Sequence, residues 1–151
     1  MGLLLMLVAM PTFGNEGRPA DLSVLSCIKE AAARYEIGYP LLLAIAKQES
    51  DLRPSVVHRN PPTKKNPAGS EDVGLFQINT DYWLPRLRKY GITKASLLNP
   101  CVNAHVAAWV VWENKKTNGN TWKAIGAFNS PIPEKQQKYI QRVWKYFRGV
   151  V

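Results

Sequence analysis

The segment Leu41–Gln48 constrains the fold of this chain more than any other part of the sequence. It reads LLLAIAKQ and is apolar nearly all round when wound as a helix. Pro40 precedes it at a position that suits the first turn of a helix. A helix without a polar face is buried on most of its sides. The rest of the chain is therefore expected to enclose this helix.

Helical patterns account for most of the remaining sequence. Apolar residues recur at three- and four-residue spacing, and Pro or Gly separates one such segment from the next. We expect helices over residues 21–37, 80–91 (interrupted by Pro85), 101–116, 121–127 and 134–148. Residues 54–72 are rich in Pro and Asn and read as a loop or a small irregular hairpin, and strand signals are confined to 74–79. The predicted fold class is mainly α.

Length and charge narrow the class of protein. A chain of 151 residues with 46% hydrophobic and 21% charged residues fits one globular domain with a sizeable core. Its net charge of +9 is spread along the chain. A positive surface favours an anionic partner, which includes a nucleic acid, an acidic polymer or a membrane face. Charge alone does not choose among these partners.

The first 14 residues are uncharged and resemble the apolar part of a secretory signal. The continuous apolar stretch from Leu3 to Met10 is shorter than the roughly 20 residues that cross a bilayer. We expect cleavage ahead of Asn15 and one domain over residues 15–151, with no membrane segment in the mature chain. The usual basic residues before the apolar stretch are missing, so the true start lies upstream or the signal is weak. A buried first helix is the alternative.

The sequence contains two cysteines, Cys27 and Cys101. In an exported protein two cysteines usually pair, and closing a loop of about 75 residues is worth about 4 kcal/mol in the chain-entropy model. Two buried free thiols are the alternative for a cytosolic chain. His58 and His105 stand apart from other ligand-type residues, so neither a metal site nor a cofactor is expected.

The chemistry centres on Glu49, which follows directly after the apolar helix. Burial makes a carboxyl group costly to ionise, so its proton stays on to higher pH, as a general acid requires. Asp72 is the second candidate, because cleavage of a glycosidic bond also needs a group that stabilises positive charge on the sugar. Gln77 and Asn79 offer amides for sugar hydroxyls. Taken singly, Asp72 also fits a solvated loop charge, and the two amides also fit turn residues.

Taken together, four motifs resemble those of the soluble lytic transglycosylase family, in the same order. They are Glu49-Ser50, Gly74-Leu75-Phe76-Gln77-Ile78-Asn79, Ala127-Phe128-Asn129-Ser130 and Tyr139. The resemblance runs from about Asp21 to Arg148 and includes the spacing of both cysteines. Within the family, the chain is most similar to small exported members that accompany conjugation, type III and type IV secretion, and pilus systems.

The resemblance implies a lysozyme-like α domain that cleaves the MurNAc–GlcNAc bond of peptidoglycan in the periplasm or outside the cell. Glu49 would act first as acid and then as base, while the 6-hydroxyl of the sugar attacks and leaves a 1,6-anhydro end. Ser50 would position the N-acetyl group, and Tyr139 would orient Glu49. Gln77, Asn79 and Asn129 would bind the glycan. The expected partners are glycan strands and components of a secretion or pilus machine, and the chain is expected to be a monomer.

Three departures from the family pattern are visible. Phe76 stands where methionine is common, and Phe128 stands in place of a tyrosine. Asp72 precedes the second motif as in animal-type lysozymes, where the matching aspartate is catalytic, so a hydrolytic muramidase that uses Glu49 and Asp72 is an alternative.

Two other classes of function compete with an enzyme. A peptidoglycan-binding module without turnover would have no need of an acid such as Glu49. A nucleic-acid-binding protein is disfavoured by the apolar leader and by the two cysteines expected to pair. The basic helix over residues 134–148 fits a nucleic-acid or membrane surface, but equally a domain helix with a solvated basic face.

Overall fold

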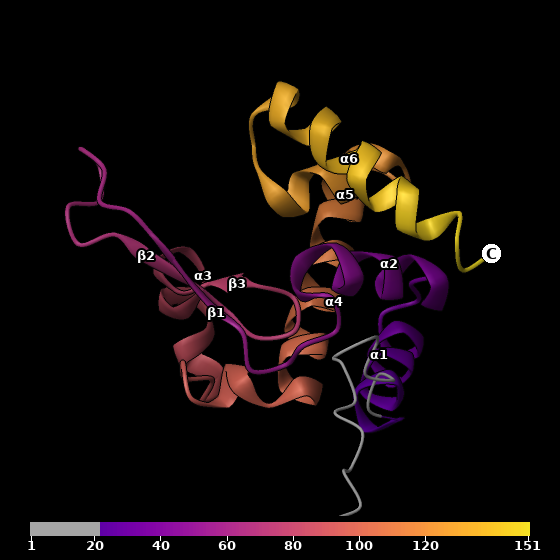
Figure 1. Cartoon of the computed structure of the whole chain (residues 1–151), viewed down its shortest axis with the longest axis horizontal. Helices are drawn as coiled ribbons and strands as arrows, with labels where there is room; N and C mark the ends of the chain where they lie inside the picture. The colour runs from indigo at the N-terminus through magenta and orange to yellow at the C-terminus, as the bar shows by residue number, and fades with distance from the viewer. Residues whose placement is uncertain (1–21) are drawn as a thin grey trace, which may run out of the picture.

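The computed structural model describes residues 22–151, and this part of the chain is mostly helical (Figure 1). The α-helices are α1 Leu22–Arg34, α2 Tyr39–Ser50, α3 Thr80–Leu87, α4 Pro100–Asn118, α5 Trp122–Asn129 and α6 Pro133–Phe147. Two short 3-10 helices, η1 Arg88–Tyr90 and η2 Ser96–Leu98, join α3 to α4. The strands are β1 Val57–Asn60, β2 Ser70–Val73 and β3 Ile78–Asn79. The mainly α prediction is confirmed, while the leader predicted at residues 1–14 lies outside the described residues.

Helix α2 is enclosed as its composition predicts. It packs against α1 on one side and against α6 on another, and α6 also covers α5 (Figure 1). Leu42, Ala44, Ile45 and Ala46 have no exposed surface. Of the two last residues of α2, Ser50 is buried and Glu49 is partly buried.

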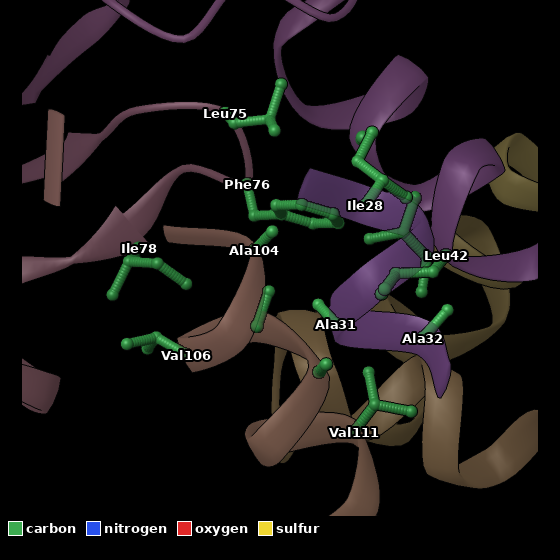
Figure 2. Packing of buried hydrophobic residues seen from close by; sticks show 14 of the residues in the cluster. Ile28, Ala31, Ala32, Leu42, Leu75, Phe76, Ile78, Ala104, Val106 and Val111 are labelled. Carbon is green, nitrogen blue, oxygen red and sulfur yellow. The ribbon is translucent and has the colours of Figure 1, made fainter. Parts of the chain in front are cut away.

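Small side chains allow α1 and α4 to pack closely. Ala31 and Ala32 of α1 and Ala104 of α4 are buried in the same core, as Figure 2 shows. The Cys27–Cys101 disulfide links the same two helices across a sequence separation of 74 residues. The predicted pairing is confirmed, and it ties α1 to the first turn of α4.

The connection between β2 and β3 adds the other half of the core. Leu75 and Phe76 are fully buried, and the Phe76 ring points toward Ile28 of α1 beside Ala104 of α4 (Figure 2). Two apolar side chains in a short loop thus anchor the sheet to the helices.

Helix α1 ends earlier than its sequence pattern predicts. The expected end lay near Ile37-Gly38, but Glu36 adopts a left-handed conformation with φ of 52°. The Ile37 N–H then donates to the Ala32 carbonyl at 2.9 Å, and the Glu36 N–H donates to the Ala33 carbonyl at 3.4 Å. These two bonds form a Schellman cap, which glycine usually closes. Because this position holds a glutamate and not a glycine, nothing in the sequence indicated that the helix ends here.

The sheet is larger than the strand signals predict. Residues 57–60 and 70–73 pair antiparallel, with Asn60 opposite Ser70, so the region 54–72 contains a hairpin. Within the segment 74–79 only Ile78 and Asn79 form a strand, where Asp72 pairs with Asn79. The strand prediction for 74–77 is wrong, because Gly74 and Gln77 adopt positive φ values of 81° and 48° and close a turn.

The structure also tests the predictions made for the helix that contains Pro85 and for the basic helix over residues 134–148. The interruption expected at Pro85 is wrong, since α3 continues to Leu87. A proline inside a helix removes only one backbone hydrogen bond. The start of α3 is stabilised by the Asn79 side chain, which accepts from the Tyr82 N–H at 3.0 Å. Helix α6 is a domain helix whose Tyr139 and Val143 are buried. None of the described helices has the length and apolar character needed to cross a bilayer.

Candidate active site

A cleft of about 640 Å³ lies between the sheet and the end of α5, and Glu49 lies within it. Five side chains from β1, β2, β3 and the turn before β3 form what we term the sheet wall: Asn60, Ser70, Asp72, Gln77 and Asn79. Residues 127–131 line the opposite side, which we term the helical wall. Glu49, Asp72, Gln77, Asn79 and Asn129 were predicted from separate stretches of sequence, and all five line this one cleft.

Glu49 is mostly buried at the end of α2, and among residues 22–151 its side chain is hydrogen-bonded to one other side chain. The Tyr139 hydroxyl donates to Glu49 Oε1 at 2.5 Å, across 90 residues of sequence. Tyr139 is 1% exposed, and the ring of Phe128 stacks on it at 6.4 Å between centroids. Helix α6 therefore fixes one oxygen of Glu49.

The pKa of Glu49 is raised from its ordinary value to about 7. Burial is the largest cause, because it disfavours the charged form. The Tyr139 hydrogen bond lowers the pKa, the negative charge of Asp72 raises it, and the positive charge of Arg142 lowers it. Burial raises the pKa of Tyr139 well above its usual range, so the phenol remains a donor. Glu49 is thus a carboxyl group that both donates and accepts a proton near neutral pH.

Asp72 is held by amides from the strands on either side of β2. Asn60 Nδ2 donates to Asp72 Oδ2 at 2.8 Å, and Asn79 Nδ2 donates to Asp72 Oδ1 at 2.8 Å. Register explains this arrangement: Asp72 pairs with Asn79 on β3, and Asn60 at the end of β1 pairs with Ser70, two residues before Asp72 and therefore on the same face of the sheet. Each carboxylate oxygen is fixed by one N–H, so the negative charge is oriented within the cleft.

The turn before β3 depends on Gly74 and Gln77. A Cβ added at Gly74 would lie 2.5 Å from the Leu97 carbonyl oxygen, so only glycine fits there. Gln77 Nε2 donates to the Gly74 carbonyl at 2.9 Å and to the Val56 carbonyl at 3.1 Å. Gln77 therefore fastens its own turn to the segment before β1 while its side chain lines the cleft.

Ser50 faces the interior instead of the cleft lining. Its hydroxyl donates to the Leu75 carbonyl at 2.7 Å and accepts from the Arg53 N–H at 3.1 Å, and the residue is 3% exposed. This position joins the end of α2 to the turn of the sheet wall. The contact with an N-acetyl group that the family resemblance implies for Ser50 stays a prediction.

The helical wall is held by the turn between α5 and α6. Gln136 Nε2 donates to the Ser130 carbonyl at 2.9 Å, and the Ile132 N–H donates to Ser130 Oγ at 3.2 Å. A Cβ on Gly126 would lie 2.7 Å from the Cβ of Gln136, so glycine lets α5 and α6 approach closely. Asn129 ends α5 with its side chain exposed at the cleft.

Asn103 is a positioning residue that the sequence interpretation missed. It is fully buried on α4, where Oδ1 accepts from the Phe76 N–H at 2.8 Å. Its Nδ2 donates to the carbonyls of Val73 at 2.9 Å and Leu97 at 2.8 Å. One amide thus satisfies three backbone groups around the turn of the sheet wall. The sequence offered one indication of this role, because Asn103 is a polar residue among the apolar positions of its helix.

Among residues 22–151, no group of three His, Cys, Asp or Glu side chains is arranged to hold a metal ion. The polar groups of the cleft are carboxylates, amides and hydroxyls. Together with Tyr82 and Trp83, which also line it, they suit a carbohydrate: polar groups pair with hydroxyls, and aromatic rings offer apolar faces.

Comparison with known proteins gives a consistent family. Residues 26–146 match the family model described as the transglycosylase SLT domain. The invasion protein IagB of Salmonella typhimurium is 34% identical over 127 residues, covering 81% of this chain and 75% of that protein. Protein IpgF of Shigella flexneri is 36% identical over 126 residues, covering 80% and 78%.

A further relative and a solved structure agree with this. A putative peptidoglycan-binding-like protein of Escherichia coli K12 is 32% identical over 133 residues, covering 83% of each chain. An inactive mutant of the lytic transglycosylase Slt from Pseudomonas aeruginosa superposes with a TM-score of 0.58 and 20% identity. That match covers 81% of this chain but 23% of the other, and it shows a shared fold.

Proposed function

Because this chain belongs to the transglycosylase SLT domain family of peptidoglycan lytic transglycosylases, we propose that it cleaves the MurNAc–GlcNAc bond with formation of 1,6-anhydro-MurNAc ends. The observation that carries the proposal is the Glu49–Tyr139 pair: a mostly buried carboxyl group with a pKa of about 7 in a polar cleft. Such a group suits a reaction in which one residue gives a proton and then takes one back.

The reaction balances with Glu49 as the one acid and base. The protonated carboxyl group transfers its proton to the glycosidic oxygen as the bond from that oxygen to C1 of MurNAc breaks. The carboxylate then takes the proton of the C6 hydroxyl as O6 bonds to C1. Glu49 ends protonated as it began, and no water is consumed. Tyr139 holds one carboxyl oxygen throughout, which leaves the other for proton transfer.

Asp72 supports the positive charge that develops on the sugar ring. Its carboxylate lines the same cleft, and two amides orient it. The same observation favours a second candidate function, a hydrolytic muramidase in which water replaces the C6 hydroxyl as the nucleophile. The two functions share Glu49 and differ in the end that is released.

The substrate places the protein in the cell envelope, and we propose a periplasmic or secreted location. We further propose that it opens the wall locally for a secretion, conjugation or pilus apparatus. The relative in Salmonella is named an invasion protein, and this name supports a secretion-related role. The net charge of +9 suits a polymer whose peptide stems carry carboxylates.

Mass spectrometry of muropeptides released from purified sacculi tests the proposal. Anhydro ends from the parent protein, and none from Glu49→Gln, are the expected result. Reducing ends, heavier by one water, would instead identify a muramidase. Release of nothing by the parent, with sacculus binding equal to that of Glu49→Gln, would show a binding module and refute both enzymatic functions. Asp72→Asn with full activity would remove Asp72 from the mechanism.

A further inference from the structure

The amide groups of the sheet wall have no N–H left to offer a ligand. Asn60 Nδ2 uses its two hydrogens on Ser70 Oγ at 3.1 Å and on Asp72 Oδ2. Asn79 Nδ2 uses its two on Ser70 Oγ at 3.1 Å and on Asp72 Oδ1. Gln77 Nε2 uses both on the backbone carbonyls of Val56 and Gly74. An amide nitrogen carries two hydrogens, so each of the three donors is fully committed.

The orientation of these amides follows from their partners. Asn79 Oδ1 accepts from the Tyr82 backbone N–H, so its nitrogen must face Asp72. A carboxylate only accepts, so Asn60 must also present its nitrogen to Asp72. Gln77 faces two carbonyls, which likewise require its nitrogen. The amides therefore meet a ligand in the cleft with oxygen alone.

Ser70 is the exception on this wall. Its oxygen accepts from both Asn60 and Asn79, which occupies the two acceptor positions of a hydroxyl. No described residue accepts the Ser70 hydroxyl proton, and the residue is half-buried in the lining of the cleft. The two amides thus leave the hydroxyl only one way to bind a ligand, as a donor.

We propose that Ser70 is a substrate-binding residue that donates a hydrogen bond to an acceptor oxygen of the glycan. The other side chains of the sheet wall accept hydrogen bonds from donor groups of the glycan. The inference rests on the proposed function and adds a specificity rule to it. Hydroxyl and acetamido N–H groups of the sugar suit Asp72, Gln77 and Asn79. A sugar oxygen without a proton, such as an acetamido carbonyl, ring oxygen or ether oxygen, suits Ser70.

The helical wall supplies the contrast. Asn129 is exposed at the cleft, and no described residue pairs with its amide, so it can donate and accept. A glycan between the two walls therefore meets mixed hydrogen-bonding groups on one side and acceptors with a single donor on the other. This asymmetry gives the strand a preferred orientation in the cleft.

The test compares Ser70→Ala with Ser70→Thr, which keeps the hydroxyl. Ser55→Ala makes the same change at an exposed position outside the cleft and serves as the matched control. The readout is the initial rate of muropeptide release from purified sacculi at low substrate, measured from pH 5 to pH 8. Thermal unfolding of each variant establishes that it is folded.

Loss of one uncharged hydrogen bond to substrate lowers the rate of Ser70→Ala by about 2- to 12-fold. The loss should be equal at every pH, because the donor acts on the glycan and not on Glu49. Ser70→Thr should recover the parent rate. A rate for Ser70→Ala equal to that of Ser55→Ala, a loss that Ser70→Thr fails to restore, or a loss confined to one part of the pH range would overturn the inference while leaving the proposed function intact. A parent protein that releases nothing refutes the proposed function, and this inference falls with it.

Discussion

Replacing Glu49 with glutamine should stabilise the folded protein, and should do so more at high pH than at low pH. The pKa of Glu49 is about 7 in the fold, against an ordinary value of 4.5. Between these two values the folded chain binds more protons than the unfolded chain, so the free energy of unfolding falls as pH rises from about 4.5 to about 7. Glutamine carries no charge, and its Oε1 can still accept from the Tyr139 hydroxyl.

The magnitude follows from the same pKa. One pKa unit corresponds to about 1.4 kcal/mol. The raised pKa of Glu49 therefore lowers the free energy of unfolding by under about 1 kcal/mol at pH 5 and by about 3 kcal/mol at pH 8. The pKa of about 7 already includes the bond from Tyr139 to the carboxylate, and at pH 5 the folded protein holds Glu49 in its neutral form, which glutamine resembles. The ionisation cost therefore separates the two proteins far more at pH 8 than at pH 5. We therefore expect the advantage of Glu49→Gln to grow by about 2 to 3 kcal/mol from pH 5 to pH 8.

Urea unfolding of the parent and of Glu49→Gln at pH 5 and pH 8 measures this difference. Glu30→Gln makes the same chemical change on the exposed surface of α1 and should not reproduce the effect. An advantage for Glu49→Gln that is the same at both pH values would refute the argument that burial holds the proton on Glu49. A loss of stability at pH 8 would refute it more strongly.

Three further predictions follow from single contacts. Tyr139→Phe removes the hydrogen bond that lowers the pKa of Glu49, so the high-pH limb of the pH–rate profile should move up by about one to two units while the maximal rate falls; an unmoved limb contradicts the pairing. Asn103→Leu leaves the Phe76 N–H and the Val73 and Leu97 carbonyls without partners and should cost at least about 3 kcal/mol in urea unfolding; a loss below about 1 kcal/mol would show that the turn re-forms without Asn103. Glu36→Gly relieves the left-handed conformation at the end of α1 and should raise the free energy of unfolding by about 0.5–1 kcal/mol, whereas Glu30→Gly inside α1 should lower it by about 1 kcal/mol.

Local patterns predicted the helices well, because helical periodicity and Pro or Gly breakers act within a few residues. Their failures also have local causes. The end of α1 was missed because Glu36 occupies the left-handed position, where a glycine usually marks the end of a helix. The sequence predicted only a loop or a small irregular hairpin over residues 54–72, because strands of four residues carry little periodicity; the pairing of β1 with β2 shows that the hairpin is correct.

The site divides in a similar way. Glu49, Asp72, Gln77, Asn79 and Asn129 were identified from motifs, and the cleft contains all five. Asn60 and Ser70 lay in a segment that read as a loop or a small irregular hairpin, so nothing in the sequence brought Asn60 to Asp72 or Ser70 into the cleft. The inward-facing position of Ser50 was equally hidden, because it depends on the Leu75 carbonyl, which lies 25 residues further along the chain.

The sequence by itself determined that this chain has a buried helix with a carboxyl group at its end, two cysteines that could pair and the motifs of its family. Those properties reside in the residues and their spacing. The sequence also led us to expect an acid at Glu49, but only the tertiary structure supplied the contacts that set its pKa. The Tyr139 hydroxyl comes from 90 residues away, and burial by surrounding elements brings the pKa of Glu49 to about 7. Strand register decided that two amides hold Asp72 and leave the Ser70 proton for a ligand, because hydrogen bonds between distant residues depend on the fold.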